Sequence, residues 1–362
     1  MSFTEIKYYL PEFFYPFLPE IFSREIPKEI FTDCYRCPMI CNSREEMGQD
    51  VSKPFAPDTK CCTYFPHIPN FLAGAVFVDD DPSLEQGRDR LRKCIKEKKG
   101  VYPHGIFPTK KYSILYELGK ADGFGKSQIL KCPFYLDGDY NCSLWKYREA
   151  VCATWFCKHV GQQAGQSFWS SVTKCLKYME ECLILYVLKK ENLPVIHPFG
   201  NNNNISYEDL DELPMNKAEY DYRWHKWVGR EEEFYIQSFD YIKNLSKEGF
   251  SALMGINFQI MLSELEENYE PLVQIPEILQ ADPSQTFKET EKGYYRIELK
   301  TWIERNDSYV THAINFPKII IDSFDGSRTT NEVMDLLREK HEINPGRDII
   351  IALYQHGVLI RR

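Results

Sequence analysis

The sequence predicts an α+β protein in which a mainly helical part precedes a small mixed module. Apolar residues between Gln166 and Lys190 recur every three to four positions, which is the period of an amphipathic helix. A second helical region covers residues 217–270. In contrast, β-branched and aromatic residues cluster in 294–302 and 308–315, as strands require. A chain of 362 residues is long enough for two or three domains.

Four segments are expected in chain order. Residues 1–33 form an aromatic and proline-rich N-terminal arm, and residues 34–199 form a mainly helical domain that carries the cysteines. Residues 200–283 comprise a helical segment and a linker from Pro271 to Pro283. Residues 284–362 form a C-terminal module, with helices expected over 331–341 and 346–356 and a last strand over 358–361.

Composition and charge exclude several classes of protein. The formal net charge of −9 argues against binding to nucleic acid. No stretch approaches the roughly 20 apolar residues of a transmembrane helix. The first 22 residues lack the basic leader and the cleavage site of a signal peptide. We therefore expect a cytoplasmic protein that binds neither membranes nor nucleic acid.

The 12 cysteines need an explanation other than disulfides, because the cytoplasm keeps thiols reduced. Nine of them are grouped at short spacings, and we predict that they are metal ligands: Cys34, Cys37, Cys41, Cys61, Cys62, Cys132, Cys142, Cys152 and Cys157. Thiolates spaced like Cys34 and Cys37 reach one ion, whereas the adjacent Cys61 and Cys62 diverge and serve different metal atoms or bridge them. Nine thiolates exceed one four-thiolate site, so zinc ions, iron–sulfur clusters or a site with a spare thiol all fit.

Residues beside the cysteines extend the predicted site. Arg148 is expected to give hydrogen bonds or positive charge to an anionic thiolate cluster. His159 is a candidate ligand or proton donor, with a hydrogen-bonded structural histidine as the alternative. The turn residues 137–139 predict a short hairpin, and the glycine-rich residues 119–125 predict a loop that covers the site. The other cysteines are assigned to structural or core positions: Cys94, Cys175 and Cys182.

A family resemblance lies in the second half of this array. The stretch CPFYLDGDYNCSLWKYREAVC (132–152) resembles the C-P-F…C-x-[IL]-[YW]-x-x-R-x-x-x-C pattern of the zinc- or iron-chelating cysteine-cluster (YkgJ-type) family. The upstream cysteines resemble that family's C-x2-C-x(2,3)-C-C signature, although residues 42–60 separate Cys41 from Cys61 here. The resemblance implies metal binding. A related cysteine pattern occurs in flagellin lysine N-methylases, so the resemblance adds methyl transfer to the alternatives.

A second resemblance lies in the C-terminal module. The stretch DGSRTTNEV (325–333) and the ending LYQHGVL (353–359) resemble the winged-helix domains of the PqqD-like group. That resemblance implies a peptide or protein partner, gripped by an added strand, with a purely structural wing as the alternative. DNA binding is disfavoured, because residues 317–362 contain seven basic and seven acidic side chains.

Two functions follow from the sequence. The first is a metal-binding protein that uses the clustered cysteines for an iron–sulfur cluster or zinc. The alternative is a metalloenzyme, redox or protein-modifying, that acts on a peptide or protein presented by the C-terminal module. The two differ in whether one metal position stays open to a substrate. No catalytic residue is assigned from the sequence.

Overall fold

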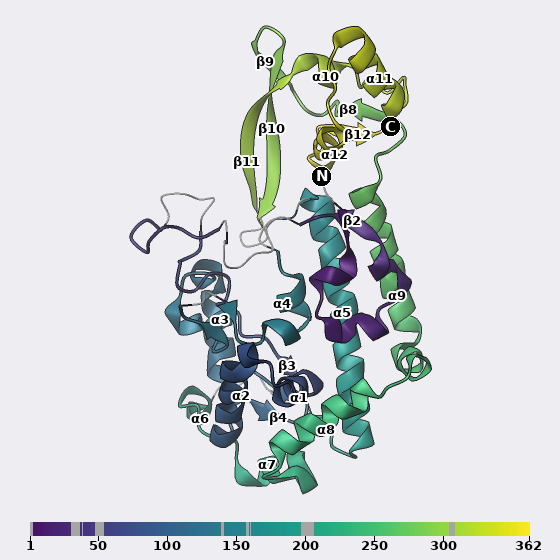
Figure 1. Cartoon of the computed structure of the whole chain (residues 1–362). Coiled ribbons are helices and arrows are strands. Elements are labelled where there is room, and N and C mark those ends of the chain that lie inside the picture. Colours follow the sequence, from purple (N-terminus) through teal and green to yellow (C-terminus); the bar gives the residue numbers. More distant parts are fainter. Residues whose placement is uncertain are drawn as a thin grey trace.

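The computed structural model describes residues 3–29, 37, 39–47, 54–138, 141–156, 159, 161–196, 206–303 and 308–362. These residues build an α+β protein with two hydrophobic cores, as the sequence predicts at this level. The larger core joins the N-terminal arm, the cysteine-bearing segments and the long helices into one helical body. The smaller core belongs to the C-terminal module, which lies above the body in Figure 1.

The helical body contains short strands between its helices. Its α-helices are α1 (Asn70–Val78), α2 (Glu85–Glu97), α3 (Lys110–Gly123), α4 (Ala150–Thr154), α5 (Gln162–Lys190), α6 (Tyr207–Leu210), α7 (Lys217–Trp224), α8 (Glu231–Lys243) and α9 (Lys247–Val273). Its strands are β1 (Phe3–Glu5), β2 (Glu25–Pro27), β3 (Ile68–Pro69), β4 (Val101–Tyr102), β5 (Gly105–Ile106), β6 (Tyr135–Leu136) and β7 (Asn141–Cys142). All pairs among them are antiparallel: β1 with β2, β3 and β4 with β5, and β6 with β7.

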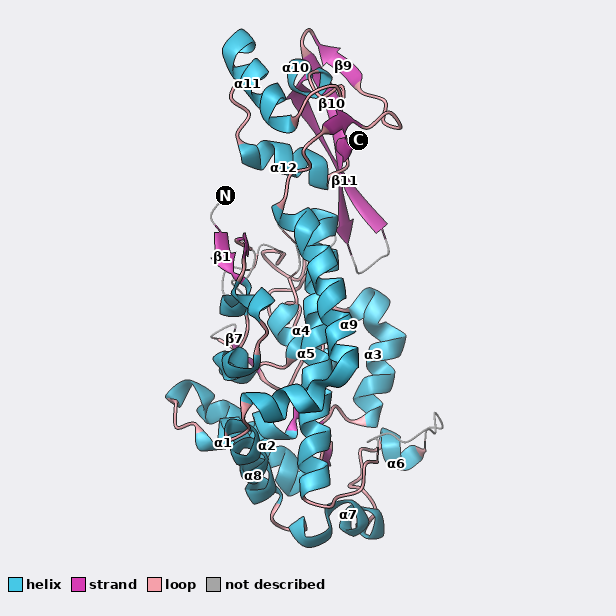
Figure 2. Ribbon diagram, turned by 90° about the vertical axis from the view of Figure 1, so that its right-hand side faces the viewer, coloured by secondary structure: helices cyan, strands magenta, loops and turns pink. Residues whose placement is uncertain are grey.

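Helix α5 lies at the centre of the body. The apolar residues that predicted it are all fully buried: Phe168, Val172, Leu176, Met179, Leu183 and Val187. Helix α9 runs beside α5, as both views show (Figures 1 and 2). Helix α1 packs against α8 so closely that a Cβ atom on Gly74 would lie 1.8 Å from the carbonyl oxygen of Tyr235. Only glycine allows this approach.

The N-terminal arm packs on the outside of the long helices. Three 3₁₀ helices lie between its strands: η1 (Ile6–Tyr9), η2 (Glu12–Phe17) and η3 (Glu20–Ser23). Phe14, Phe22 and Ile26 are buried in the main core, and β2 and η2 contact α9. Burial of these apolar side chains, rather than regular hydrogen bonding, holds the arm in place.

The C-terminal module combines two small sheets with three helices. Its elements are β8 (Leu279–Ala281), β9 (Lys288–Glu291), β10 (Tyr294–Ile303), β11 (Ser308–Pro317), α10 (Lys318–Asp322), α11 (Thr330–His341), α12 (Arg347–Gln355) and β12 (Leu359–Arg361). The strands pair in the order β11–β10–β9, and β12 pairs with β8. Thr329 and Glu332 form a reciprocal capping box that begins α11. The helices and strands expected here are confirmed to within two residues.

Two sequence expectations are wrong. Residues 119–123 do not form a loop, because α3 continues to Gly123, and only Phe124 and Gly125 of the predicted loop lie in a turn. Leu130 lies within ordinary contact of a Cβ placed at Gly119. Residues 271–283 are not only a linker. Helix α9 continues through Pro271 to Val273. Leu279 begins strand β8, and the Leu279 side chain is fully buried in the smaller core. In both places tertiary packing overrides the local turn signal.

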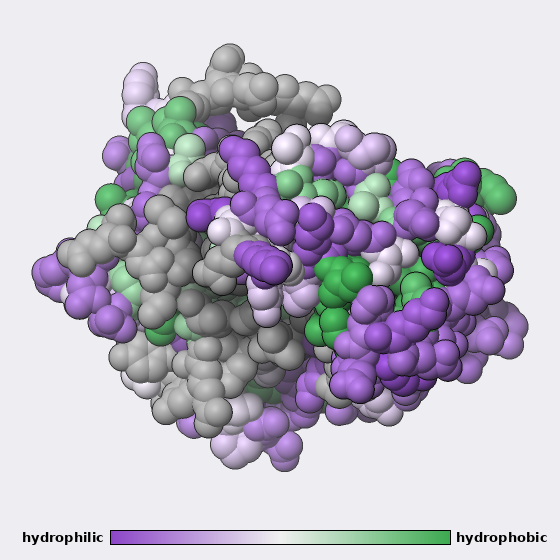
Figure 3. Space-filling view, turned by 90° about the horizontal axis from the view of Figure 1, so that it is seen from above, coloured by the Kyte–Doolittle hydropathy of each residue, from purple (hydrophilic) through white to green (hydrophobic). Residues whose placement is uncertain are grey.

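The surface is mainly hydrophilic at the C-terminal end. Seen from above, purple hydrophilic residues surround a few small hydrophobic patches (Figure 3). Of the helices in the described ranges, none is both long and apolar enough to cross a membrane.

Candidate metal centre

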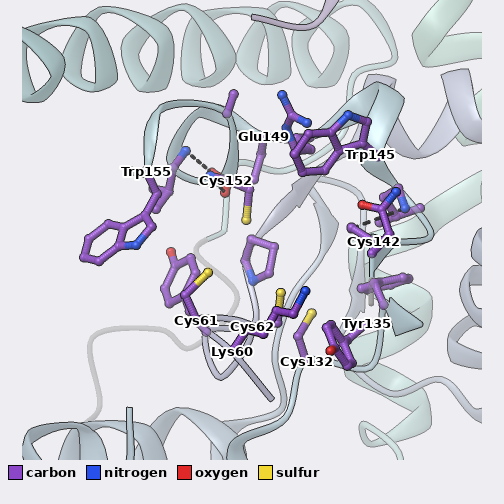
Figure 4. A pocket seen from close by; sticks show the side chains of 18 of the residues that line it. Lys60, Cys61, Cys62, Cys132, Tyr135, Cys142, Trp145, Glu149, Cys152 and Trp155 are labelled. Carbon is purple, nitrogen blue, oxygen red and sulfur yellow. Dashed lines mark hydrogen bonds between the residues drawn. The ribbon is translucent and has the colours of Figure 1, made fainter. Parts of the chain in front are cut away.

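Most of the predicted cysteine ligands meet at one cavity of about 510 Å³ inside the helical body. Of the seven that the structure describes, six line it: Cys37, Cys61, Cys62, Cys132, Cys142 and Cys152. Figure 4 shows the sulfur atoms of Cys61, Cys62 and Cys132 on one side and that of Cys152 on the other, all turned toward the same space. The six come from five short segments. Those of Cys132, Cys142 and Cys152 follow one another within one stretch of the chain, whereas Cys37 and the pair Cys61 and Cys62 lie much earlier, so the tertiary fold brings the two groups together.

The remaining cysteines lie elsewhere. Cys41 is buried, but its Sγ donates a hydrogen bond to the carbonyl oxygen of Phe55 (3.1 Å), and it does not line the cavity. Cys34 and Cys157 lie outside the described residues. The three cysteines that were assigned to core or structural positions also do not line the cavity: Cys94, Cys175 and Cys182. Each of these three packs in or against the main core, as predicted.

The loops that carry Cys62 and Cys132 are joined directly. The amide of Cys132 donates to the carbonyl oxygen of Cys62 at 2.8 Å. Tyr112 of α3 links the same two loops, because its hydroxyl lies 2.8 Å from the Thr63 oxygen and 3.0 Å from the Leu130 oxygen. The same hydroxyl accepts a hydrogen bond from the Phe65 amide at 2.8 Å. One half-buried tyrosine therefore links both cysteine loops.

A hairpin positions Cys142 relative to Cys132, as the turn residues predict. Tyr135 of β6 pairs with Cys142 of β7. Ser143 closes the hairpin by donating both its amide and its hydroxyl to the Phe134 oxygen (2.9 and 3.0 Å). The Leu144 amide donates to the sulfur of Cys142 at 3.3 Å, the kind of contact that stabilises a thiolate ligand.

Helix α4 positions Cys152 through two buried carboxyl groups. Glu149 caps the helix, with one oxygen accepting from the Val151 amide (2.8 Å) and the other from the Cys152 amide (2.7 Å). Glu180 of α5 accepts from the Ala150 amide at 2.8 Å. Burial raises the pKa of Glu149, and it raises the pKa of Glu180 well above its usual range. Glu180 therefore holds a proton more tightly than an exposed glutamate does, and its hydrogen bond links α4 to α5.

The thiols of the cavity are held in the protonated form. Burial raises the pKa of Cys37, Cys132, Cys142 and Cys152. For Cys62 a hydrogen bond with Cys61 contributes most, and burial adds to it. Because thiolates are the species that bind metals, a metal that binds here displaces these protons.

Arg148 lies at the predicted place beside the cysteines. Its guanidinium stacks 3.5 Å from the ring centre of Trp145, and Nη2 donates to the Tyr9 oxygen at 3.4 Å. Its positive charge favours the thiolate of Cys142 and lowers the pKa of that thiol against the larger effect of burial. Arg148 thus has the position that a residue balancing the charge of a thiolate centre needs.

His159 does not line the cavity. Its ring lies edge-on to Phe156, with ring centres 6.1 Å apart. Burial lowers the pKa of His159 to about 4, so the imidazole is neutral at physiological pH. Its Nδ1 atom is buried without a hydrogen-bond partner among the described residues.

Several charged cavity residues escape the sequence analysis, among them Lys60 and Glu149. Lys60 precedes Cys61, and Glu149 stands between Arg148 and Cys152; both line the cavity. Their nearness to the cysteines in the chain is the one signal that could have identified them. Trp155 closes the side of the cavity opposite Trp145, and its indole nitrogen is buried without a partner among the described residues (Figure 4).

The sulfur atoms surround the cavity without converging on a point. Among the described residues, no three His, Cys, Asp or Glu side chains approach one another closely enough to hold an ion as they stand. Zinc binds sulfur at about 2.3 Å, so thiols that line a wider space must turn inward to coordinate it. The residue types fit a soft metal centre, and the wall of thiols supplies more sulfur atoms than one ion needs.

No family model, curated protein or solved structure matches the chain. The resemblance to the cysteine-cluster family, and that of the C-terminal module to the PqqD-like group, therefore stay predictions that rest on the quoted motifs.

Proposed function

We propose that the chain is a metal-binding protein whose cavity cysteines hold zinc or an iron–sulfur cluster. The observation that supports this most strongly is the meeting of six cysteines from five segments at one cavity. Cysteines that serve only as small apolar residues have no reason to gather around an open space. Three other cysteines of this chain do not line it: Cys94, Cys175 and Cys182.

The donor set indicates which metals suit the site. Thiolates are soft ligands that select zinc, copper(I) or iron–sulfur clusters over magnesium or calcium. The lining contains one carboxyl group among the described residues, Glu149, and both of its oxygens accept hydrogen bonds from α4. The cavity therefore offers sulfur rather than oxygen.

Anaerobic purification followed by iron, zinc and acid-labile sulfide analysis tests the proposal. Iron and sulfide in near-equal amounts identify a cluster, and one or two zinc ions identify a zinc site. Cys132→Ala should lose most of the metal. Cys175→Ala is the matched control, because it removes an equally buried thiol that does not line the cavity. Metal-free wild-type protein, or equal metal in both variants, would refute the proposal.

The size of the cavity favours a second function, a metalloenzyme. A space of about 510 Å³ lies within the range of roughly 300–1,000 Å³ that small-molecule sites occupy, and an ion coordinated by sulfur needs little of it. Aromatic side chains form much of the lining, including Tyr64, Trp145 and Trp155. On this proposal the site modifies a peptide or protein that the C-terminal module presents, by redox chemistry or group transfer.

An open coordination position separates the two functions. Catalytic metals keep a position for water or substrate, whereas structural zinc does not. Adding azide or imidazole to the cobalt-substituted protein should change its visible spectrum if such a position exists. An unchanged spectrum at saturating ligand would count against the enzyme.

A further inference from the structure

Part of the cavity lining consists of aromatic rings instead of sulfur. The rings of Tyr64 and Tyr116 have centres 5.7 Å apart and planes at 62°. The rings of Phe124 and Trp155 form a second pair, with centres 5.7 Å apart and planes at 63°. Tyr116 belongs to α3, while Phe124 and Trp155 cap the C-terminal ends of α3 and α4. Because both pairs line the cavity, ring surface faces a space that no side chain of the described residues fills.

Two hydrogen-bond donors in this aromatic part of the lining are unused. The indole nitrogen of Trp155 is buried and has no hydrogen-bond partner among the described residues. Figure 4 shows this nitrogen on the side of its ring that faces Cys61. The Tyr64 hydroxyl likewise forms no hydrogen bond within the described part of the chain. An indole N–H can only donate, and a buried donor without an acceptor is costly, so both groups favour an occupant that supplies acceptor atoms.

Water alone is a poor occupant for this part of the cavity. A buried water molecule needs about two to four polar partners, whereas the surface here consists mainly of aromatic rings. The volume of about 510 Å³ is also larger than an aromatic ring requires. A cavity of roughly 150 Å³ is enough to hold benzene. An aromatic molecule therefore fits here, with room left beside the cysteines for a metal ion.

The cavity also reaches the surface of the protein. Four of the side chains that line it are exposed to solvent: Tyr8, Asn141, Trp145 and Lys177. They form a rim through which a small molecule can enter without any separation of the long helices. The aromatic part of the lining is thus accessible to a ligand from solution.

We propose that this part of the cavity binds a planar aromatic molecule that carries a carbonyl or carboxylate oxygen. The rings of Tyr116 and Phe124 would pack against the ring of the ligand, while the Trp155 indole and the Tyr64 hydroxyl would donate hydrogen bonds to its oxygen. Aromatic rings by themselves would also suit an organic cation, but a cation offers nothing to the two unused donors. The inference goes beyond the proposed metal-binding function and does not depend on it, because neither donor is a metal ligand.

A ligand-observed NMR titration of the reduced full-length chain tests the proposal with four simple probes. Benzamide and benzoate carry both the ring and the acceptor, and they distinguish a neutral carbonyl from a carboxylate. At least one of them should bind with a dissociation constant of about 1 mM or below. Cyclohexanecarboxamide lacks the aromatic ring and benzylamine lacks the acceptor, so each should bind at least about fivefold more weakly. Metal content measured on the same sample keeps this result separate from the test of metal binding.

Two variants each remove one donor and keep an aromatic ring. Trp155→Phe and Tyr64→Phe should each weaken binding of the tighter probe about three- to tenfold, which is the effect of one hydrogen bond. Trp224→Phe is the matched control. Its indole nitrogen is also buried without a partner among the described residues, but Trp224 does not line the cavity, so the affinity should not change. If one donor variant does not fold, the other still decides.

The outcomes are distinct. Weaker binding in a donor variant, with wild-type affinity in Trp224→Phe, would support the proposal. Absence of binding by both benzamide and benzoate at about 10 mM would overturn it, as would wild-type affinity in both donor variants or an equal loss in Trp224→Phe. Benzylamine that binds as tightly as the better of the two acids and amides would show that the rings select a cation. Equal binding of cyclohexanecarboxamide would show that they do not select an aromatic ligand, and either result would also overturn the proposal.

Discussion

Replacement of Glu180 by glutamine should stabilise the metal-free protein at neutral and alkaline pH. Glu180 is 6% exposed and accepts one hydrogen bond, from the Ala150 amide at 2.8 Å. Glutamine keeps a carbonyl oxygen at the same place, so Glu180→Gln should preserve the link between α4 and α5. The change removes the ability of this buried group to ionise.

The sign follows from the direction of the pKa shift. Burial, with the nearby Glu149 adding to it, raises the pKa of Glu180 well above its usual range. The folded state therefore binds a proton more tightly than the unfolded state, and stability falls as pH rises above the unfolded value of about 4.3. At a pH above both pKa values, each pKa unit by which the folded value exceeds the unfolded value lowers the free energy of unfolding by about 1.4 kcal/mol. Glu180→Gln removes that cost, so we expect a gain of about 1–3 kcal/mol at pH 8 and little gain near pH 4.

Urea unfolding of reduced protein in the presence of a chelator, followed by tryptophan fluorescence at pH 5 and pH 8, measures the effect. Glu191, which caps the C-terminal end of the same helix, offers a control of opposite sign. Although burial opposes its ionisation, hydrogen bonds from Tyr241, Lys226 and Trp227 hold its pKa below the usual range. Glu191→Gln should therefore be less stable than wild type at pH 8. A Glu180→Gln protein that is also less stable at pH 8, or that shows the wild-type dependence on pH, would refute the reasoning.

Two further predictions test how the site and the body are built. Tyr112→Phe removes the hydroxyl that links the two cysteine loops; we expect a loss of about 1–3 kcal/mol in urea unfolding and a weaker cobalt affinity, and unchanged affinity would contradict the link. Gly74→Ala places a Cβ atom 1.8 Å from the Tyr235 oxygen and should cost about 3 kcal/mol or more, whereas Gly119→Ala meets no atom closer than 3.9 Å and should add up to about 1 kcal/mol of stability. Equal melting temperatures for the two glycine variants would show that α1 and α8 do not meet as described.

The sequence predicts the elements that make repeated contact with a core. Helix α5 was predicted because its apolar residues recur at the helical period over more than five turns, and that period is the direct consequence of one buried face. The long strands of the C-terminal module were predicted for a related reason, since branched and aromatic side chains pack well on a pleated surface. The glycine-rich end of α3 was not predicted as a helix, because Gly119 and Gly123 carry no side chain whose period could show a buried face; in the structure both pack near Leu130.

The candidate site shows the same division. Short spacings predict that cysteines share a purpose, and six of the seven that the structure describes do line one cavity. The spacing could not show that the Cys41 side chain points away from the cavity. Its direction depends on a β-bridge between Ile40 and Phe55, which belong to two separate segments of the chain. Nor could it identify Lys60 as a buried residue of the cavity lining, because its burial and its left-handed backbone have no sequence signature.

The position of the cavity within the body bears on what a bound metal would do. Small zinc domains are unfolded without their ion, because they have too little core to fold alone. Here the main core extends through α1, α5, α8 and α9, and most of it consists of aromatic and aliphatic side chains that do not line the cavity. The body should therefore stay folded without metal, while the loops that carry Cys61, Cys62 and Cys132 loosen. If the body does melt at the same temperature with and without metal, the proposed metalloenzyme is favoured over a purely structural metal site.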